Sequence, residues 1–125
     1  MEGGLLPVGP VQVAEQLPDS HPSKKPAREY IAAYEAKFGT GSATGFGAYS
    51  WDLGIWLQQA LPVALKAGKP GTPEFRSALR DALENLHNVI GAHGVYNLSP
   101  TDHQGLDNRG YVIVSIQNGS WKLAE

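Results

Sequence analysis

The stretch from Ala43 to Leu65 constrains the fold of this chain more than any other part of its sequence. It reads ATGFGAYSWDLGIWLQQALPVAL, so apolar and aromatic residues occupy nearly every side of a helix, with the acid Asp52 among them. A helix that is apolar all round must be covered all round, by protein or by lipid. The polar side chains of the stretch and the interruption at Pro62 argue against a membrane span. We therefore expect a helix buried among other elements.

The size and charge of the chain narrow its class. Its 125 residues are enough for one domain, and its formal net charge of −2 offers no basic surface for nucleic acid or anionic lipid. It contains no cysteine, which excludes disulfides, thiolate catalysis and thiolate metal sites. Residues 1–4 lack the basic charge of a secretory signal. We expect no nucleic-acid partner and no signal peptide within this chain.

Residues 5–16 are predicted to include an extended segment. Val11 and Val13 favour a strand-like conformation there, and whether Val8 belongs to the same segment is left open. Pro7 and Pro10 each remove a donor from a strand ladder, which excludes a central strand before about Val11.

The first helix is predicted to follow a turn-rich loop at residues 17–23. Ser23 offers a side-chain oxygen for an N-cap, and Gly39 supplies a C-terminal stop. The apolar residues at helical spacing between them are Ala27, Tyr30, Ile31, Tyr34 and Phe38.

The central helix and a third helix come next. The central helix should begin near residues 43–45, and Pro62 should kink or break it near Gln58. Thr72 and Pro73 then form a start signal for the third helix. Its predicted inner face consists of Phe75, Leu79, Ala82, Leu83 and Leu86.

The last third of the chain favours strands. Residues 89–96 are β-branched and rich in glycine, which indicates a strand edge or crossover, and residues 99–105 form a loop. Asn118-Gly119 between two alternating segments, 111–117 and 120–123, predicts a type I′ hairpin. The predicted cross-strand pairs are Ile116 with Trp121, Val114 with Leu123, and Ser115 with Lys122.

The polar residues match no established catalytic or metal-binding pattern. The four histidines are His21, His87, His93 and His103, and their spacing differs from that of zinc sites, which favours surface or capping roles. Asp102 lies beside Ser99 and His103, but the members of a catalytic triad are usually brought together by the fold. We therefore favour turn bonding by Asp102, and we expect no catalytic residue, no metal and no cofactor.

Two features of the central helix leave alternatives open. Asp52 must be hydrogen-bonded inside an apolar helix, so it holds a loop or a neighbouring helix terminus, or it contacts a ligand. The aromatic side chains fill a core or form a stacking surface for a small ligand, with core packing favoured for most of them. These aromatic residues are Phe46, Tyr49, Trp51 and Trp56.

Most of the chain resembles the C-terminal part of a type I periplasmic substrate-binding protein, of the leucine/isoleucine/valine-binding-protein-like group that serves ABC importers. The resemblance is carried by Trp51-Asp52 in the long helix, by the preceding helix that ends in Phe38-Gly39, and by the hairpin with Asn118-Gly119-Ser120-Trp121. The family commonly has Tyr-Asp-Ala where this chain has Trp51-Asp52-Leu53, so the acid is kept.

The resemblance implies a three-layer α/β fold with two lobes, of which this chain is an incomplete C-terminal fragment with about three helices and a C-terminal β-hairpin. Residues from about 15 to 90 then belong to one lobe and residues from about 95 to 125 to the other. Val11–Leu17 and Ile90–Asn97 are then two of the three crossovers between the lobes, which close on a ligand by hinge motion.

The resemblance also implies a function without catalysis. The full-length protein is expected to be a periplasmic receptor that binds an amino acid or an aromatic or aliphatic acid and delivers it to an ABC permease. Phe46 aligns with a position that contacts the ligand side chain in branched-chain amino-acid binders, and Gly45 and Tyr49 flank it. A ligand-sensing regulatory or receptor domain on the same fold is the alternative. Helix faces made for an absent sheet should be exposed in this chain and cause self-association.

Overall fold

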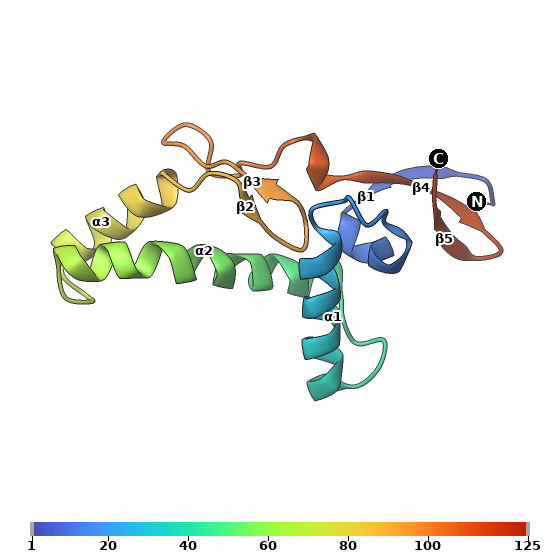
Figure 1. Ribbon diagram of the computed structural model, residues 1–125, viewed down its shortest axis with the longest axis horizontal. Helices are drawn as coiled ribbons and strands as arrows, with labels where there is room; N and C mark the ends of the chain where they lie inside the picture. The colour runs from blue at the N-terminus through green and yellow to red at the C-terminus, as the bar shows by residue number, and fades with distance from the viewer. Residues whose placement is uncertain (1, 125) are drawn as a thin grey trace.

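The long helix α2 (Gly45–Ala67) is the axis of the molecule, which a computed structural model describes for residues 2–124. Figure 1 shows α3 (Pro73–Glu84) lying along one end of α2, a small sheet at the opposite end, and α1 (Lys24–Phe38) projecting away from the axis. The described residues therefore form an elongated α/β structure, and the predicted fold class, with three α-helices and a C-terminal hairpin, is confirmed.

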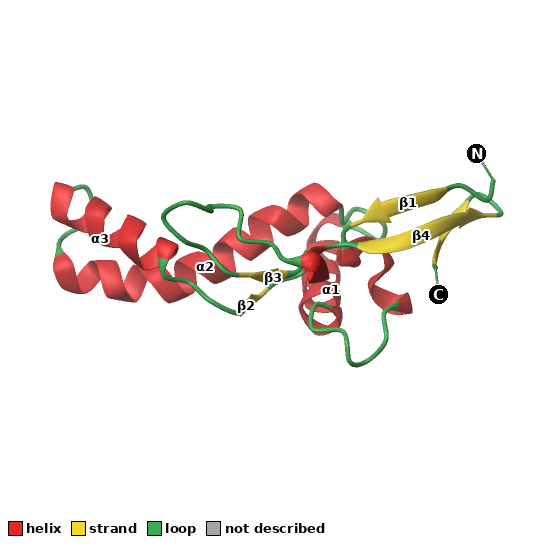
Figure 2. Cartoon of the chain, turned by 90° about the horizontal axis from the view of Figure 1, so that it is seen from above, coloured by secondary structure: helices red, strands yellow, loops and turns green. Residues whose placement is uncertain are grey.

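Both ends of the chain contribute to one antiparallel sheet with the strand order β1-β4-β5. Its strands are β1 (Leu5–Val8), β4 (Val112–Gln117) and β5 (Ser120–Leu123), and Figure 2 shows both chain ends at the sheet end of the molecule. A second ribbon of two short strands, β2 (Val89–Ile90) and β3 (Val95–Tyr96), lies beside α2. The predicted strand character of residues 89–96 is therefore confirmed.

The C-terminal hairpin has the predicted turn and register. Asn118 and Gly119 both have positive φ, 53° and 70°, as a type I′ turn requires. Its cross-strand pairs are Ile116 with Trp121, Val114 with Leu123, and Ser115 with Lys122. The prediction succeeds because the turn conformation is set by two adjacent residues.

The prediction of an extended segment at Val11 and Val13 is wrong. Pro10–Gln16 form the 3-10 helix η1, and the strand lies earlier, at Leu5–Val8. Pro10 suits the first position of a helical turn, where no backbone donor is needed. Pro7 is tolerated in β1 because this strand is at the sheet edge and pairs only with β4.

Helix α1 has the predicted stop but lacks the predicted side-chain cap. Gly39 has φ of 97°, and its N–H donates to the carbonyl of Glu35, which ends the helix. Ser23 has helical φ and ψ of −80° and −7° rather than the extended conformation from which a capping side chain reaches forward. Its buried hydroxyl has no hydrogen-bond partner among the described residues, so the capping prediction for Ser23 is wrong.

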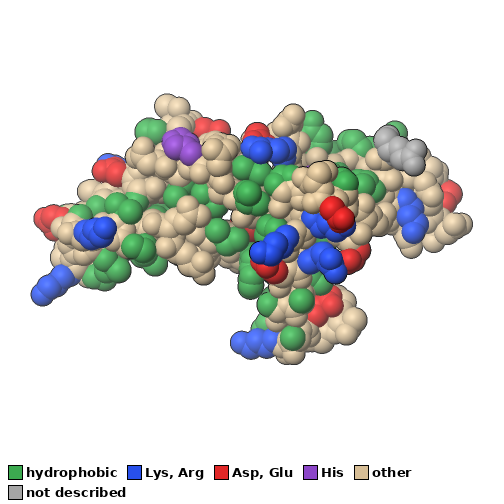
Figure 3. Space-filling view, in the orientation of Figure 1, with side chains coloured by type: hydrophobic (Ala, Val, Ile, Leu, Met, Phe, Trp, Pro, Cys, Tyr) green, Lys and Arg blue, Asp and Glu red, His purple; other side chains and the backbone are tan. Residues whose placement is uncertain are grey.

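Helix α2 is not covered on all sides, so its prediction as a buried helix is wrong for the described residues. Its buried residues are Ala48, Asp52, Ala60 and Ala64. Its exposed large apolar residues are Phe46, Tyr49, Trp51, Leu53, Val63 and Leu65. Figure 3 shows hydrophobic side chains at the surface over α2, which confirms the expectation of uncovered apolar helix faces.

Pro62 does not break α2, which continues from Gln58 to Ala67. Both Pro62 and Gln58 are exposed, so water can hydrate the carbonyl that loses its helical partner. None of the helices in residues 2–124 combines the length and the hydrophobicity that crossing a membrane would require.

Three small clusters replace a single large core. The one that supports the cleft described below joins η1, α1 and the start of α2, and consists of Val11, Ala14, Ala27, Tyr30, Ala48 and Ala92. Another lies under the sheet, around Val13, Leu17 and Val114. Helix α3 begins at the predicted cap, where the Thr72 side chain accepts from the N–H of Phe75.

Candidate functional site

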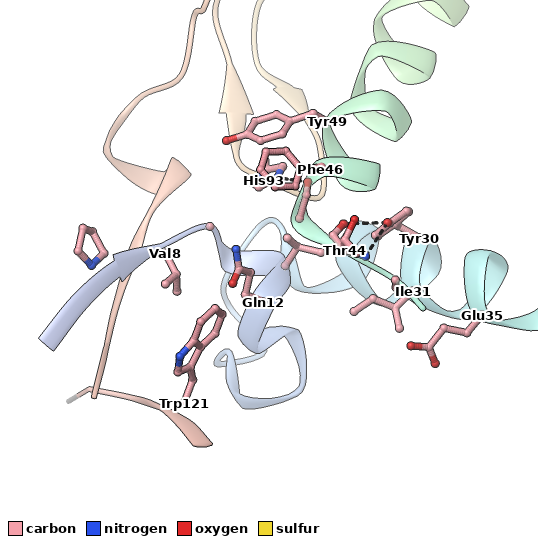
Figure 4. A pocket seen from close by; sticks show the side chains of 15 residues that line it. Val8, Gln12, Tyr30, Ile31, Glu35, Thr44, Phe46, Tyr49, His93 and Trp121 are labelled. Carbon is pink, nitrogen blue, oxygen red and sulfur yellow. Dashed lines mark hydrogen bonds between the residues drawn. The ribbon is translucent and has the colours of Figure 1, made fainter. Parts of the chain in front are cut away.

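A cleft with a volume of about 720 Å³ lies at the N-terminal end of α2. The elements that meet there are β1, η1, α1, the first turns of α2, the β2–β3 loop and β5 (Figure 4). Its walls include several aromatic rings together with polar groups from η1 and α1. The residues that matter most for its chemistry are Gln12, Gly45, Phe46, Tyr49, His93 and Trp121.

The first turn of α2 is fixed by hydrogen bonds at the edge of the cleft. The Thr44 side chain accepts from the N–H of Gly47 at 3.1 Å. The Tyr30 hydroxyl donates to the Thr44 carbonyl at 2.8 Å and accepts from the Thr44 N–H at 3.1 Å (Figure 4). The first backbone N–H groups of a helix lack partners within the helix and favour negatively charged groups. This end of α2 can therefore receive an anionic part of a small molecule.

The three site residues predicted from the sequence all line this cleft. Phe46 is 86% exposed, and Tyr49 is more than half exposed. Core packing, which we favoured for most of the aromatic residues, is therefore wrong for these two and for Trp51, because a large part of each side chain stays exposed even though Tyr49 contacts His93 and Trp51 contacts Tyr30. Trp56 does pack inside, with its ring edge-on to Tyr96 at 4.8 Å.

Sequence reasoning missed His93, which it treated as a surface or capping residue. Only 3% of His93 is exposed, and its ring stacks on Tyr49 with 3.7 Å between ring centroids. Its Nε2 lies 2.8 Å from the Gly45 carbonyl oxygen, so Nε2 carries the proton and donates. The only sequence signal was its position between glycines, in Gly91-Ala92-His93-Gly94. Gln12 and Trp121 were also missed, because they come from distant elements.

Asp52 binds the loop that carries His93. Its carboxylate accepts from the N–H groups of Ala92 at 2.6 Å and His93 at 2.9 Å, and from the Tyr96 hydroxyl at 2.7 Å. Burial, reinforced by the bond to Asp52, raises the pKa of Tyr96, so this hydroxyl stays a donor in alkaline as well as neutral solution. Asp52 is 1% exposed, and the interpretation of it as an acid that holds a loop is confirmed.

The other polar features make local bonds or pair with each other. Asp102 accepts from the N–H groups of Gln104 and Gly105, which confirms its predicted role in a turn. A second hollow of about 380 Å³ lies between α2 and α3, and charged groups on its rim pair with one another, Glu84 with both Arg80 and His103. Within residues 2–124, no group of three His, Asp or Glu side chains is arranged to hold a metal ion.

Solved structures of proteins from Rhodopseudomonas palustris share the architecture of this chain. A protein from Rhodopseudomonas palustris strain CGA009 is 41% identical, with a TM-score of 0.89, over 99% of this chain and 35% of that protein. An extracellular ligand-binding receptor from Rhodopseudomonas palustris HaA2 is 40% identical, with a TM-score of 0.89, over 99% of this chain and 35% of the receptor. An extracellular ligand-binding receptor from Rhodopseudomonas palustris is 39% identical, with the same TM-score, over 99% of this chain and 34% of the receptor.

The similarity covers nearly all of this chain but only a part of each solved protein. The chain spans about a third of the length of the solved structures that it matches. No protein-family model matches it. No curated protein matches it either.

Proposed function

We propose that this chain is part of a type I periplasmic ligand-binding receptor of the leucine/isoleucine/valine-binding-protein-like group, and that its cleft binds one side of a small carboxylate. The main observation behind the proposal is that one cleft, at a helix N-terminus, is lined by Gly45, Phe46 and Tyr49. The similarity to extracellular ligand-binding receptors at about 40% identity supports it. The receptor is non-catalytic, lies in the periplasm and delivers its ligand to an ABC permease.

The two ends of the molecule correspond, in this proposal, to two lobes of the receptor. Residues from about 15 to 90 belong to one lobe and those from about 95 to 125 to the other. Figure 1 supports this division for the sheet, which lies at the opposite end from the α2–α3 pair. Residues 95–106 lie beside α2 and α3 instead, where Tyr96, Leu98 and Leu106 pack with Trp56 and Leu83. Strand β1 adds Leu5–Val8 to the sheet end. The cleft lies between these ends, where closure of the lobes would bury a ligand.

The walls of the cleft favour a ligand with an apolar or aromatic body and a carboxylate. The exposed ring of Phe46 and the Tyr49 ring provide apolar surface, and Trp121 approaches from the sheet. The free N–H groups at the start of α2 suit a carboxylate. We therefore place amino acids and aromatic or aliphatic acids among the ligands.

A thermal-shift screen of the full-length protein with L-leucine, L-phenylalanine and benzoate tests this function. A ligand present at one hundred times its dissociation constant stabilises the folded state by about 2.7 kcal/mol, which raises the melting temperature. Phe46→Ala should weaken binding at least tenfold with little effect on the stability of the ligand-free protein, because Phe46 is exposed. Leu65→Ala, an exposed apolar change at the far end of α2, is the matched control. No shift with any of the three compounds would exclude this ligand class.

A further inference from the structure

The loop between β2 and β3 is attached to α2 by the packing of the fully buried Ala92 and by polar contacts of Asp52 and His93. Only two residue pairs form the ribbon, Val89 with Tyr96 and Ile90 with Val95, and the loop is closed by a bond from the Gly91 N–H to the Gly94 carbonyl. A two-stranded ribbon of this length is not stable on its own in water. Its position against α2 therefore depends on the groups that attach it to that helix.

Asp52 attaches the loop through three donors, all of them buried. Two are the consecutive backbone N–H groups of Ala92 and His93, and the third is the Tyr96 hydroxyl. The approach of the loop is as close as the backbone allows, since a Cβ atom on Gly91 would lie 2.5 Å from the Asp52 carboxylate. The carboxylate supplies only acceptors, which matches a site where every neighbouring polar group donates.

His93 connects the loop that Asp52 binds to the wall of the cleft. Its backbone N–H is held by Asp52, while its ring stacks on Tyr49 and its Nε2 donates to the Gly45 carbonyl. Tyr49 and Asp52 are three residues apart on α2, so they lie on the same face of the helix. Both ends of His93 are thus fixed to the first two turns of α2, and the stacked His93 and Tyr49 rings both line the cleft.

We propose that Asp52 is a positioning residue of the ligand cleft: by fixing the β2–β3 loop on α2, it holds the His93 ring against Tyr49 and Gly45 and so sets the aromatic wall that a ligand meets. Asp52 itself is buried and lies outside the cleft lining, so it acts through His93 rather than by contact with the ligand. The expected effect of Asp52 on ligand affinity rests on the proposed function. Its effect on the position of the His93 ring concerns the protein without ligand and does not.

Asp52→Asn tests the proposal, because it hardly changes the volume of the side chain. It replaces one accepting oxygen with an amide nitrogen, which would face a donor of the loop. The readout is the NMR signal of the His93 ring protons in the full-length, ligand-free protein labelled at histidine, with the signal assigned by its loss in His93→Gln. In the wild type these protons are shifted upfield by the Tyr49 ring, because the two rings are stacked. A residue that contributed only to stability would lower the melting temperature and leave this ring shift in place.

The expected result is loss of most of the upfield shift in Asp52→Asn, with partial loss in Tyr96→Phe, which removes a single donor. Asp102→Asn is the matched control, since Asp102 also accepts from two backbone N–H groups but lies in another loop, and it should leave the shift unchanged. If Asp52→Asn does not fold, Tyr96→Phe decides the outcome alone. An unchanged His93 signal in a folded variant overturns the proposal.

A second arm measures affinity for the L-leucine, L-phenylalanine and benzoate panel. Asp52→Asn should weaken the affinity of the compound that binds at least tenfold, whereas Asp102→Asn should not. A lost ring shift with unchanged affinity also overturns the proposal, because the wall would then be irrelevant to binding. Absence of binding by the wild type counts against the proposed function instead, and the ligand-free NMR arm still decides whether Asp52 sets the wall.

Discussion

At the scale of single residues, the contact between Gly91 and Asp52 shows how closely the β2–β3 loop packs against α2. The space beside Gly91 is filled by the carboxylate, whereas nothing lies within 4 Å of the corresponding position at Gly54 in the same helix as Asp52. The same substitution at these two glycines should therefore have opposite effects on stability.

We expect Gly91→Ala to lower the free energy of unfolding by about 1–3 kcal/mol, because its methyl group would displace the Asp52 carboxylate or the loop. Gly54→Ala should raise it by about 0.5–1 kcal/mol, since alanine is the better helix former and the space is open. Urea denaturation of both variants measures the difference. Equal effects at the two positions would show that the loop adjusts without cost.

His21 should make the stability of the chain depend on pH. Burial lowers the pKa of His21 below its usual value of 6.5, and its Nδ1 accepts from the Ser23 N–H, which a protonated ring cannot do. Below about pH 6.5 the unfolded chain therefore binds more protons at His21 than the folded chain does. The contribution of neutral His21 to the free energy of unfolding is lost as the pH falls through this range.

His21→Asn keeps an acceptor and removes the titrating group. The loss of stability between about pH 7 and pH 5 should be smaller in this variant than in the wild type. Thermal denaturation across this range measures the two slopes, and the other histidines contribute equally to both proteins. Identical slopes would contradict the assignment of this pH dependence to His21.

At the scale of elements, local signals predicted the helices and the hairpin well. The start of α3 depends on Thr72 and its immediate neighbours, and the hairpin turn depends on Asn118 and Gly119. Segments whose conformation depends on distant partners were predicted poorly. β1 is a strand because it pairs with β4 from the far end of the chain, and η1 packs against α1 and β5.

Pro62 within α2 provides a prediction at this scale. Pro62→Ala should raise the free energy of unfolding by about 1–3 kcal/mol, because it restores a backbone donor within the helix and no other element covers this exposed position. Pro70→Ala, in the turn after α2, is the control and should be neutral or slightly destabilising, since proline there restricts the unfolded chain. Calorimetry compares the two, and a lower melting temperature for Pro62→Ala would mean that the proline fits α2 without cost.

At the scale of the whole molecule, the candidate site shows where prediction from sequence ends. Phe46 was identified because it aligns with a ligand-contacting position of the family that the chain resembles, and Gly45 and Tyr49 because they flank it. His93, Gln12 and Trp121 reach the same cleft from three other elements, and their own neighbours in sequence give no sign of it. The wall of a cleft depends on contacts between distant segments, which no local pattern records.

The exposed apolar side chains of α2 predict self-association of this chain. Leu53, Val63 and Leu65 are each about half exposed, and apolar surface of this kind favours association. Sedimentation velocity at tens of micromolar should show a dimer or a larger species. Val63→Lys with Leu65→Lys should shift it toward monomer, whereas Thr40→Lys, in an exposed loop, should not. A compact monomer of the unmodified chain would rule this prediction out.

The pairing of β1 with β4 also has a consequence for how the chain folds. Leu5 lies opposite Ser115, so the central strand of the sheet acquires one partner only when about 110 residues of intervening chain have been brought together. The entropy of closing such a loop must be overcome before its contacts stabilise the fold, which slows folding. The helices and the β4–β5 hairpin have local contacts and can form first. We therefore expect the edge strand to dock last, in the rate-limiting step.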